Sequence, residues 1–93
     1  MKKYTVEYMN AKASYTAERL DSVAARYGHY GDLRDGDYLA VAVELYCDTH
    51  FMWEGAAHCK SVDAETRGDR TRAYEYAPDG VFVGWIYAST EEA

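Results

Sequence analysis

Tyrosine is the residue type that most constrains how this chain can build a core. Its 93 residues include ten tyrosines but only one isoleucine, two phenylalanines and four leucines. A tyrosine ring buries a large apolar area, while its hydroxyl needs a hydrogen-bond partner or water. We therefore expect many of these rings at the margin of the core with one polar edge, a position that also suits binding surfaces.

Length and charge narrow the class of protein. The length fits a single domain over residues 1–93, and a domain of this size hides only about 60–65% of its unfolded surface, so a partner or a second copy of the chain would add stability. The net charge is -6, and residues 28–54 carry six acids against Arg34 alone. Direct nucleic-acid binding needs a basic face, so we expect instead a protein partner with a basic surface.

The distribution of apolar residues and cysteines indicates the compartment. The chain contains no run of 18 apolar residues, and its first residues lack the apolar stretch of a signal peptide. Two cysteines, Cys47 and Cys59, are too few for a secreted disulfide framework and fit reduced thiols. We therefore expect a cytoplasmic protein that does not associate with a membrane.

The first third of the chain carries the clearest local signals. Alternating apolar and polar residues predict a strand over 3–9. Ser14 or Thr16 can cap a helix over 17–27, where apolar residues recur at helical spacing, and Gly28 can end it.

Less regular patterns follow. Glycines and aspartates predict a loop over 28–37, and alternation predicts a strand over 38–47. We further predict a strand over 49–54 and a hairpin of strands 71–77 and 81–88 around the loop 78–80. Together these elements predict an α+β fold, a small antiparallel sheet of about four strands with one main helix in the order β-α-β-(β)-β-β.

The predicted hairpin is apolar on both faces. A three-residue loop would pair Tyr76 with Phe82, Tyr74 with Gly84 and Arg72 with Ile86, so that an aromatic ring shields the strand glycine. One helix can cover only one face of a small sheet. The other face needs residues 49–64, a second subunit or a target protein as its cover.

Two surfaces are therefore candidates for partner binding. The first is acidic and aromatic, and the second is the exposed face of the hairpin. Their residues are Tyr30, Asp32, Asp35, Asp37 and Tyr38 for the first, and Tyr74, Tyr76, Phe82 and Ile86 for the second. Binding would proceed by acidic steering followed by burial of aromatic anchors.

A small zinc-binding module is the alternative. Cys47, His50, His58 and Cys59 supply two thiols and two imidazoles, which satisfy tetrahedral zinc. Because His58 and Cys59 are adjacent, they would point to opposite faces of a strand, and a shared metal would need an irregular turn. In a helix, Cys47, His50, Glu54 and His58 would instead form one stripe.

A thiol-dependent small enzyme is the second alternative, with Cys47 or Cys59 activated by a nearby histidine. The sequence contains no GxSxG, HExxH or phosphate-binding glycine loop that would support catalysis. We therefore expect no catalytic residue and no cofactor.

The chain resembles the small acidic inhibitors encoded by phages, anti-CRISPR proteins among them. The resemblance consists of size, acidity and element order, from an initial strand at Lys3 to Met9 into a helix at Ala17 to Tyr27 and on to terminal strands. It implies a stoichiometric inhibitor or adaptor in the host cytosol that occupies a nucleic-acid-binding or assembly surface of an immune complex. No individual residue role follows from it.

Overall fold

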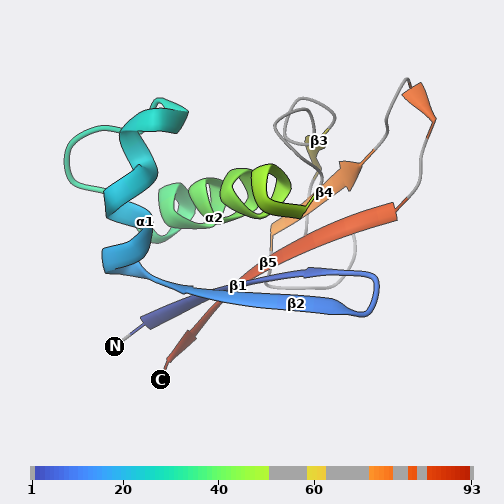
Figure 1. Ribbon diagram of the computed structural model, residues 1–93, viewed down its shortest axis with the longest axis horizontal. Helices are drawn as coiled ribbons and strands as arrows, with labels where there is room; N and C mark the ends of the chain where they lie inside the picture. Colours follow the sequence, from blue (N-terminus) through green and yellow to red (C-terminus); the bar gives the residue numbers. More distant parts are fainter. Residues whose placement is uncertain (1, 51–58, 63–71, 77–79, 82–83, 93) are drawn as a thin grey trace.

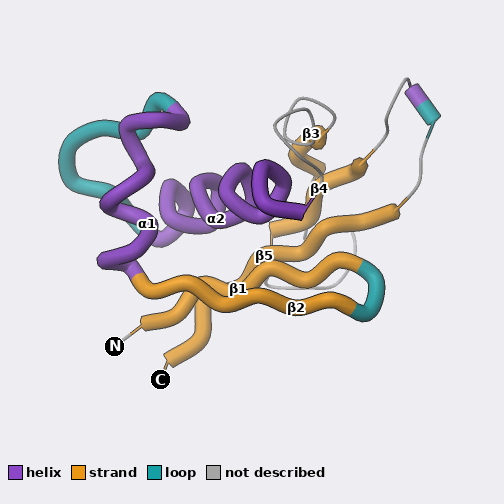
Figure 2. The backbone as a smooth tube through the Cα atoms, in the orientation of Figure 1, coloured by secondary structure: helices purple, strands orange, loops and turns teal. Residues whose placement is uncertain are grey.

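The computed structural model describes residues 2–50, 59–62, 72–76, 80–81 and 84–92. Within these ranges the strands are β1 (Lys2–Tyr8), β2 (Ala11–Thr16), β3 (Cys59–Val62), β4 (Arg72–Tyr76) and β5 (Gly84–Glu92), and the helices are α1 (Ala17–Ala24), the short 3₁₀-helix η1 (Ala25–Tyr27) and α2 (Asp35–His50). The strands form one antiparallel sheet in the order β2-β1-β5-β4-β3 (Figures 1 and 2).

The predicted α+β class with an antiparallel sheet is confirmed. The predicted four strands and single main helix are wrong, because the described residues contain five strands and two α-helices.

The N-terminal strand continues into a second strand that the sequence analysis missed. β1 turns back at Met9, which has a positive φ of 54°, and pairs with β2 from Tyr8 opposite Ala11 to Lys3 opposite Thr16. The candidate helix caps Ser14 and Thr16 both lie in β2. The short alternation of small and polar residues in this segment is a weak signal for a strand. β2 forms one edge of the sheet.

α1 begins and ends as its sequence predicts. The Thr16 hydroxyl accepts a hydrogen bond from the Arg19 backbone N–H at 3.1 Å, which confirms Thr16 as the N-cap. The helix tightens into η1 and ends at Gly28, whose φ of 83° is readily adopted by glycine. The Gly28 and His29 N–H groups bond back to the carbonyls of Ala25 and Ala24.

The prediction of a strand over 38–47 is wrong, because these residues lie inside α2. Leu39, Val41, Val43 and Leu45 alternate in sequence, but all four are buried in the helix. A helix that is apolar on most of its circumference can bury residues at both even and odd positions when it is surrounded by other elements. The ten-residue segment, apolar except for Glu44, was also long for a strand. Since α2 starts at Asp35, the preceding loop spans only 28–34, and residues 49–50 end the helix instead of starting the predicted strand; residues 51–54 lie outside the described residues.

The C-terminal strands pair as a hairpin with a shifted register. β4 pairs with β5 so that Tyr74 lies opposite Ile86 and Tyr76 opposite Gly84, two residues away from the predicted pairing of Tyr74 with Gly84. The aromatic ring against Gly84 comes from Tyr8, since a Cβ on that glycine would lie 3.0 Å from Tyr8 Cε2.

The core lies between the sheet and the two helices. α2 packs against β1 and β5, and α1 packs against α2 and the β1–β2 hairpin, so both helices lie on one face of the sheet (Figure 1). The central strands and the helices bury side chains between them, and the largest include Tyr4, Val6 and Ile86 from the strands and Leu20, Val41 and Tyr46 from the helices. No described helix covers the opposite face.

Candidate functional site

A groove opens between α1 and the start of α2. These parts of the two helices lie at the end of the molecule remote from β3 and β4 (Figure 1). Its volume is about 530 Å³, and three consecutive segments contribute its lining. The lining residues are apolar (Ala24, Ala25, Leu33), polar (Asp21, His29, Asp32), aromatic (Tyr30, Tyr38) and one glycine, Gly31. We call this feature the acidic groove.

The loop that borders the acidic groove is held by local interactions. Gly28 and Gly31 both have positive φ, at 83° and 79°, which allows the chain to reverse twice between the helices. At the far end of the loop, the Arg34 backbone N–H donates to Asp37 Oδ2 at 3.0 Å. Asp37 Oδ1 also lies 3.6 Å from His29 Nδ1. Asp37 therefore fastens both ends of the loop to the first turn of α2.

Tyr38 connects the acidic groove to the core. Its ring stacks on Tyr4 with centroids 4.9 Å apart and an interplanar angle of 29°. Its hydroxyl donates to Asp21 Oδ1 at 2.9 Å, a bond that joins α2 to α1 across the groove. The ring is thus fixed on one side by a buried tyrosine and at its tip by a carboxylate.

Several carboxylates act on the Tyr38 hydroxyl. The hydrogen bond to Asp21 is the main cause that raises the pKa of Tyr38, and the negative charges of Asp32 and Asp35 add to it. Among the residues that line the groove, His29 is the only one that can carry a positive charge. The groove is therefore a region of negative potential.

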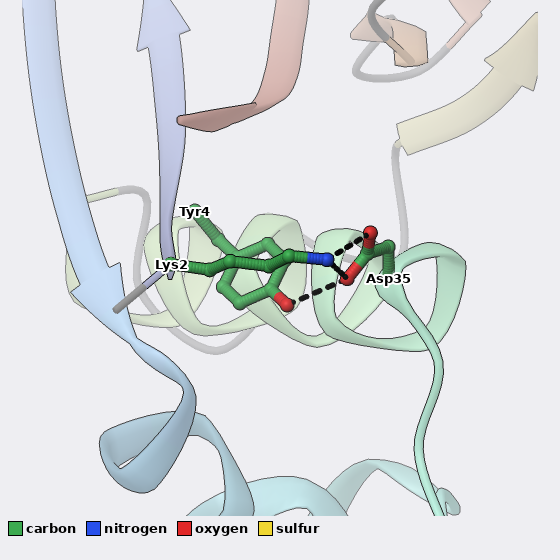
Figure 3. A network of polar contacts seen from close by, with 3 residues as sticks. All are labelled: Lys2, Tyr4 and Asp35. Atoms are coloured by element: carbon green, nitrogen blue, oxygen red, sulfur yellow. Dashed lines mark hydrogen bonds and ion pairs between the residues drawn. The ribbon is translucent and has the colours of Figure 1, made fainter. Parts of the chain in front are cut away.

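Asp35 is not among the residues that line the groove and instead makes a structural contact with β1. Its Oδ1 accepts a hydrogen bond from the Tyr4 hydroxyl at 2.8 Å, and its Oδ2 lies 3.0 Å from Lys2 Nζ (Figure 3). The hydrogen bond from Tyr4, followed by that from Lys2, lowers the pKa of Asp35. This network ties the first turn of α2 to β1.

The structure thus divides the first predicted surface. Tyr30, Asp32 and Tyr38 meet in the acidic groove, whereas Asp35 and Asp37 hold α2 and the loop. Sequence reasoning missed Asp21, although its spacing to Ala24 and Ala25 places all three on one helix face. It also missed His29 and Leu33, which only the loop conformation brings to the groove.

The second predicted surface differs more from the structure than the first. Ile86 is 0% exposed and belongs to the core, so its assignment to partner binding is wrong: the helices cover the face on which it lies. Tyr74 and Tyr76 are placed as backbone positions in β4, opposite Ile86 and Gly84. Phe82 lies outside the described residues.

The sheet face opposite the helices carries a smaller hollow. Glu7, Met9, Trp85 and Tyr87 line about 230 Å³ there, and Met9 is 77% exposed. On the same face, Lys12 Nζ lies 3.8 Å from both Glu7 Oε1 and Glu91 Oε1. Apolar and charged side chains are therefore mixed on this face.

The predicted zinc ligands are only partly placed. Cys47 is fully buried in α2, and His50 at its end stacks on Tyr46 with centroids 4.0 Å apart while its Nδ1 lies 3.1 Å from the Tyr46 carbonyl oxygen. Cys59 is placed as a backbone position in β3, and His58 lies outside the described residues. Within the described part of the chain, no three His, Cys, Asp or Glu side chains gather as a metal site.

Comparison with protein-family models, with curated proteins and with solved structures gives no match. Among the described helices, none has both the length and the apolar character to span a membrane. The chemistry of the acidic groove is therefore the basis for a functional assignment.

Proposed function

We propose that this chain is a non-catalytic protein-binding inhibitor or adaptor that engages a basic surface of its partner through the acidic groove. The observation that carries the proposal is the meeting of two carboxylates, Asp21 and Asp32, with two tyrosines, Tyr30 and Tyr38, around one opening. Carboxylates steer a basic partner toward the surface, and tyrosines supply the area that is buried on contact.

The exposure of Tyr30 supports this role. Its side chain is 76% exposed, in a chain whose other tyrosines include the fully buried Tyr4 and Tyr46. A large aromatic ring at the edge of a groove loses much exposed area when a partner covers it, which is typical of an interface anchor. Tyr38 lies beside it in a fixed orientation, so little conformational entropy is lost there on binding.

The resemblance to small acidic phage-encoded inhibitors suggests a kind of partner. A nucleic-acid-binding immune complex has basic surfaces, and occupation of such a surface by the acidic groove would block it. In this proposal the chain acts by stoichiometric occupation in the cytosol of a host cell.

Affinity capture from a candidate host lysate, at low and high salt, tests the proposal with matched variants. We expect Tyr30→Ala combined with Asp32→Asn to remove the captured protein, and Glu7→Gln, an exposed change on the sheet face opposite the helices, to retain it. We also expect raised salt to weaken capture, because steering between exposed charges is screened. An equal yield with the groove variant and the wild type would refute the proposal.

A further inference from the structure

Three features of the acidic groove bear on which basic group it accepts: its charge, its aromatic rings and its preformed shape. The considerations that follow rest on the proposed function and concern the same site. They distinguish between the two permanently basic side chains that a protein partner can present, arginine and lysine.

The negative charge of the groove is not balanced by a lysine or arginine in its own lining. Asp21 and Asp32 are both exposed, and neither lysine nor arginine is among the lining residues. The Tyr38 hydroxyl occupies Asp21 Oδ1 as a donor and fixes the direction of that carboxylate. A cation in the groove would therefore meet carboxylate acceptors, and the Tyr38 hydroxyl holds the Asp21 carboxylate in a fixed direction.

The aromatic rings favour a planar cation. A guanidinium stacks on a tyrosine face and donates at the same time, in a bidentate fork, to a carboxylate in its plane. A lysine ammonium is compact and strongly hydrated, so it gains less from a ring and loses more water on entry. Tyr30 and Tyr38 beside Asp21 and Asp32 supply both kinds of contact that a guanidinium uses.

The remaining lining suits the stem of such a side chain. Ala24, Ala25 and Leu33 offer a small apolar surface next to the polar groups. The methylene groups of an arginine cover apolar surface of this kind while the charged head stays with its partners. Because the Tyr4 stack and the Asp21 hydrogen bond hold Tyr38, the Tyr38 and Asp21 part of this arrangement exists before binding.

We infer that the acidic groove is a recognition site for an arginine side chain of the partner protein, with Asp21 and Asp32 as acceptors for the guanidinium and Tyr30 and Tyr38 as the rings against which it packs.

Titration of the ¹⁵N-labelled full chain with three capped tripeptides, Gly-Arg-Gly, Gly-Lys-Gly and Gly-citrulline-Gly, tests this inference by NMR. Citrulline has nearly the shape of arginine without its charge. We expect saturable shifts of the backbone amides of Ala25, Gly28 and Gly31 with the arginine peptide, affinity at least roughly fivefold weaker for the lysine peptide, and no saturation with citrulline. Asp32→Asn should weaken arginine binding, while Glu7→Gln, on the sheet face opposite the helices, should leave it unchanged.

The outcomes separate this inference from the proposed function. Equal affinity for the arginine and lysine peptides, shifts that map away from the groove, or no binding of the arginine peptide would each overturn arginine recognition. If lysate capture still depends on Tyr30 and Asp32 in those cases, the protein-binding function stands. Conversely, arginine-selective shifts together with capture that ignores these residues would leave the site intact and refute the proposed function.

Discussion

Leu20 and Asp21 are neighbours on α1, but Leu20 packs in the core and Asp21 lines the groove. Variants at these two positions therefore separate effects on stability from effects on binding. Leu20 is 0% exposed in the core, whereas Asp21 is exposed and lines the acidic groove. Leu20→Ala removes a buried isobutyl group and leaves a cavity, at a cost of about 3 kcal/mol. A chain of this length has a total stability of about 5–14 kcal/mol, so the variant still favours the folded state, by roughly 30-fold if the wild type lies at the lower bound.

Thermal and urea denaturation followed by circular dichroism measure the effect. We expect the melting temperature of Leu20→Ala to fall by about 12–24 °C, since 1 kcal/mol corresponds to about 4–8 °C in a domain of this size. Asp21→Asn should change the melting temperature by only a few degrees and should weaken arginine-peptide binding. At 10 °C, folded Leu20→Ala should bind the peptide as the wild type does. A loss of less than about 1 kcal/mol in Leu20→Ala would refute the packing of α1 on α2 described above.

Two further predictions concern pH. Burial is the main cause of the raised pKa of Glu44, whose Oε2 has no hydrogen-bond partner among the described residues. Ionisation of Glu44 therefore lowers the stability of the fold as pH rises above the ordinary pKa of a glutamate. Glu44→Gln should raise the urea midpoint at pH 7, through a gain of less than about 1 kcal/mol in the free energy of unfolding, and this gain should vanish near pH 4; a lower midpoint at pH 7 would contradict this reasoning. Burial, followed by the 2.5 Å hydrogen bond to Asp48, raises the pKa of Tyr27 to about 12. The contact therefore stabilises the fold in full below pH 10, and this stabilisation is lost between pH 10 and 12 as the phenol ionises. Tyr27→Phe should cost about 1 kcal/mol at pH 8 and should flatten the decline of stability over that alkaline range; an unchanged alkaline decline would contradict the assignment.

The described tyrosines differ in their environment, and the fold decides which of them are buried and which are exposed. Tyr4 and Tyr46 are buried as core substitutes for aliphatic residues, and the Tyr4 hydroxyl is satisfied by Asp35 as a buried phenol requires. Tyr30 is exposed, as a binding residue should be. Tyr38 belongs to both groups, since it stacks on the core and lines the groove.

Sequence alone determined the features that depend on near neighbours in the chain. The alternation of β1, the Thr16 cap and the Gly28 termination of the first helix all rest on contacts within a few residues, so local pattern was sufficient to predict them. The acidity of residues 28–54 likewise follows directly from the composition.

Tertiary structure alone decided the rest. An apolar run such as residues 38–47 satisfies either a strand or a helix that is enclosed on several sides, and only packing against β1, β5 and α1 selects the helix. The same packing buries Ile86 and brings Asp21 within hydrogen-bond distance of Tyr38, 17 residues further along the chain. The groove exists because two helices meet at that point, and no local pattern encodes where separate elements meet.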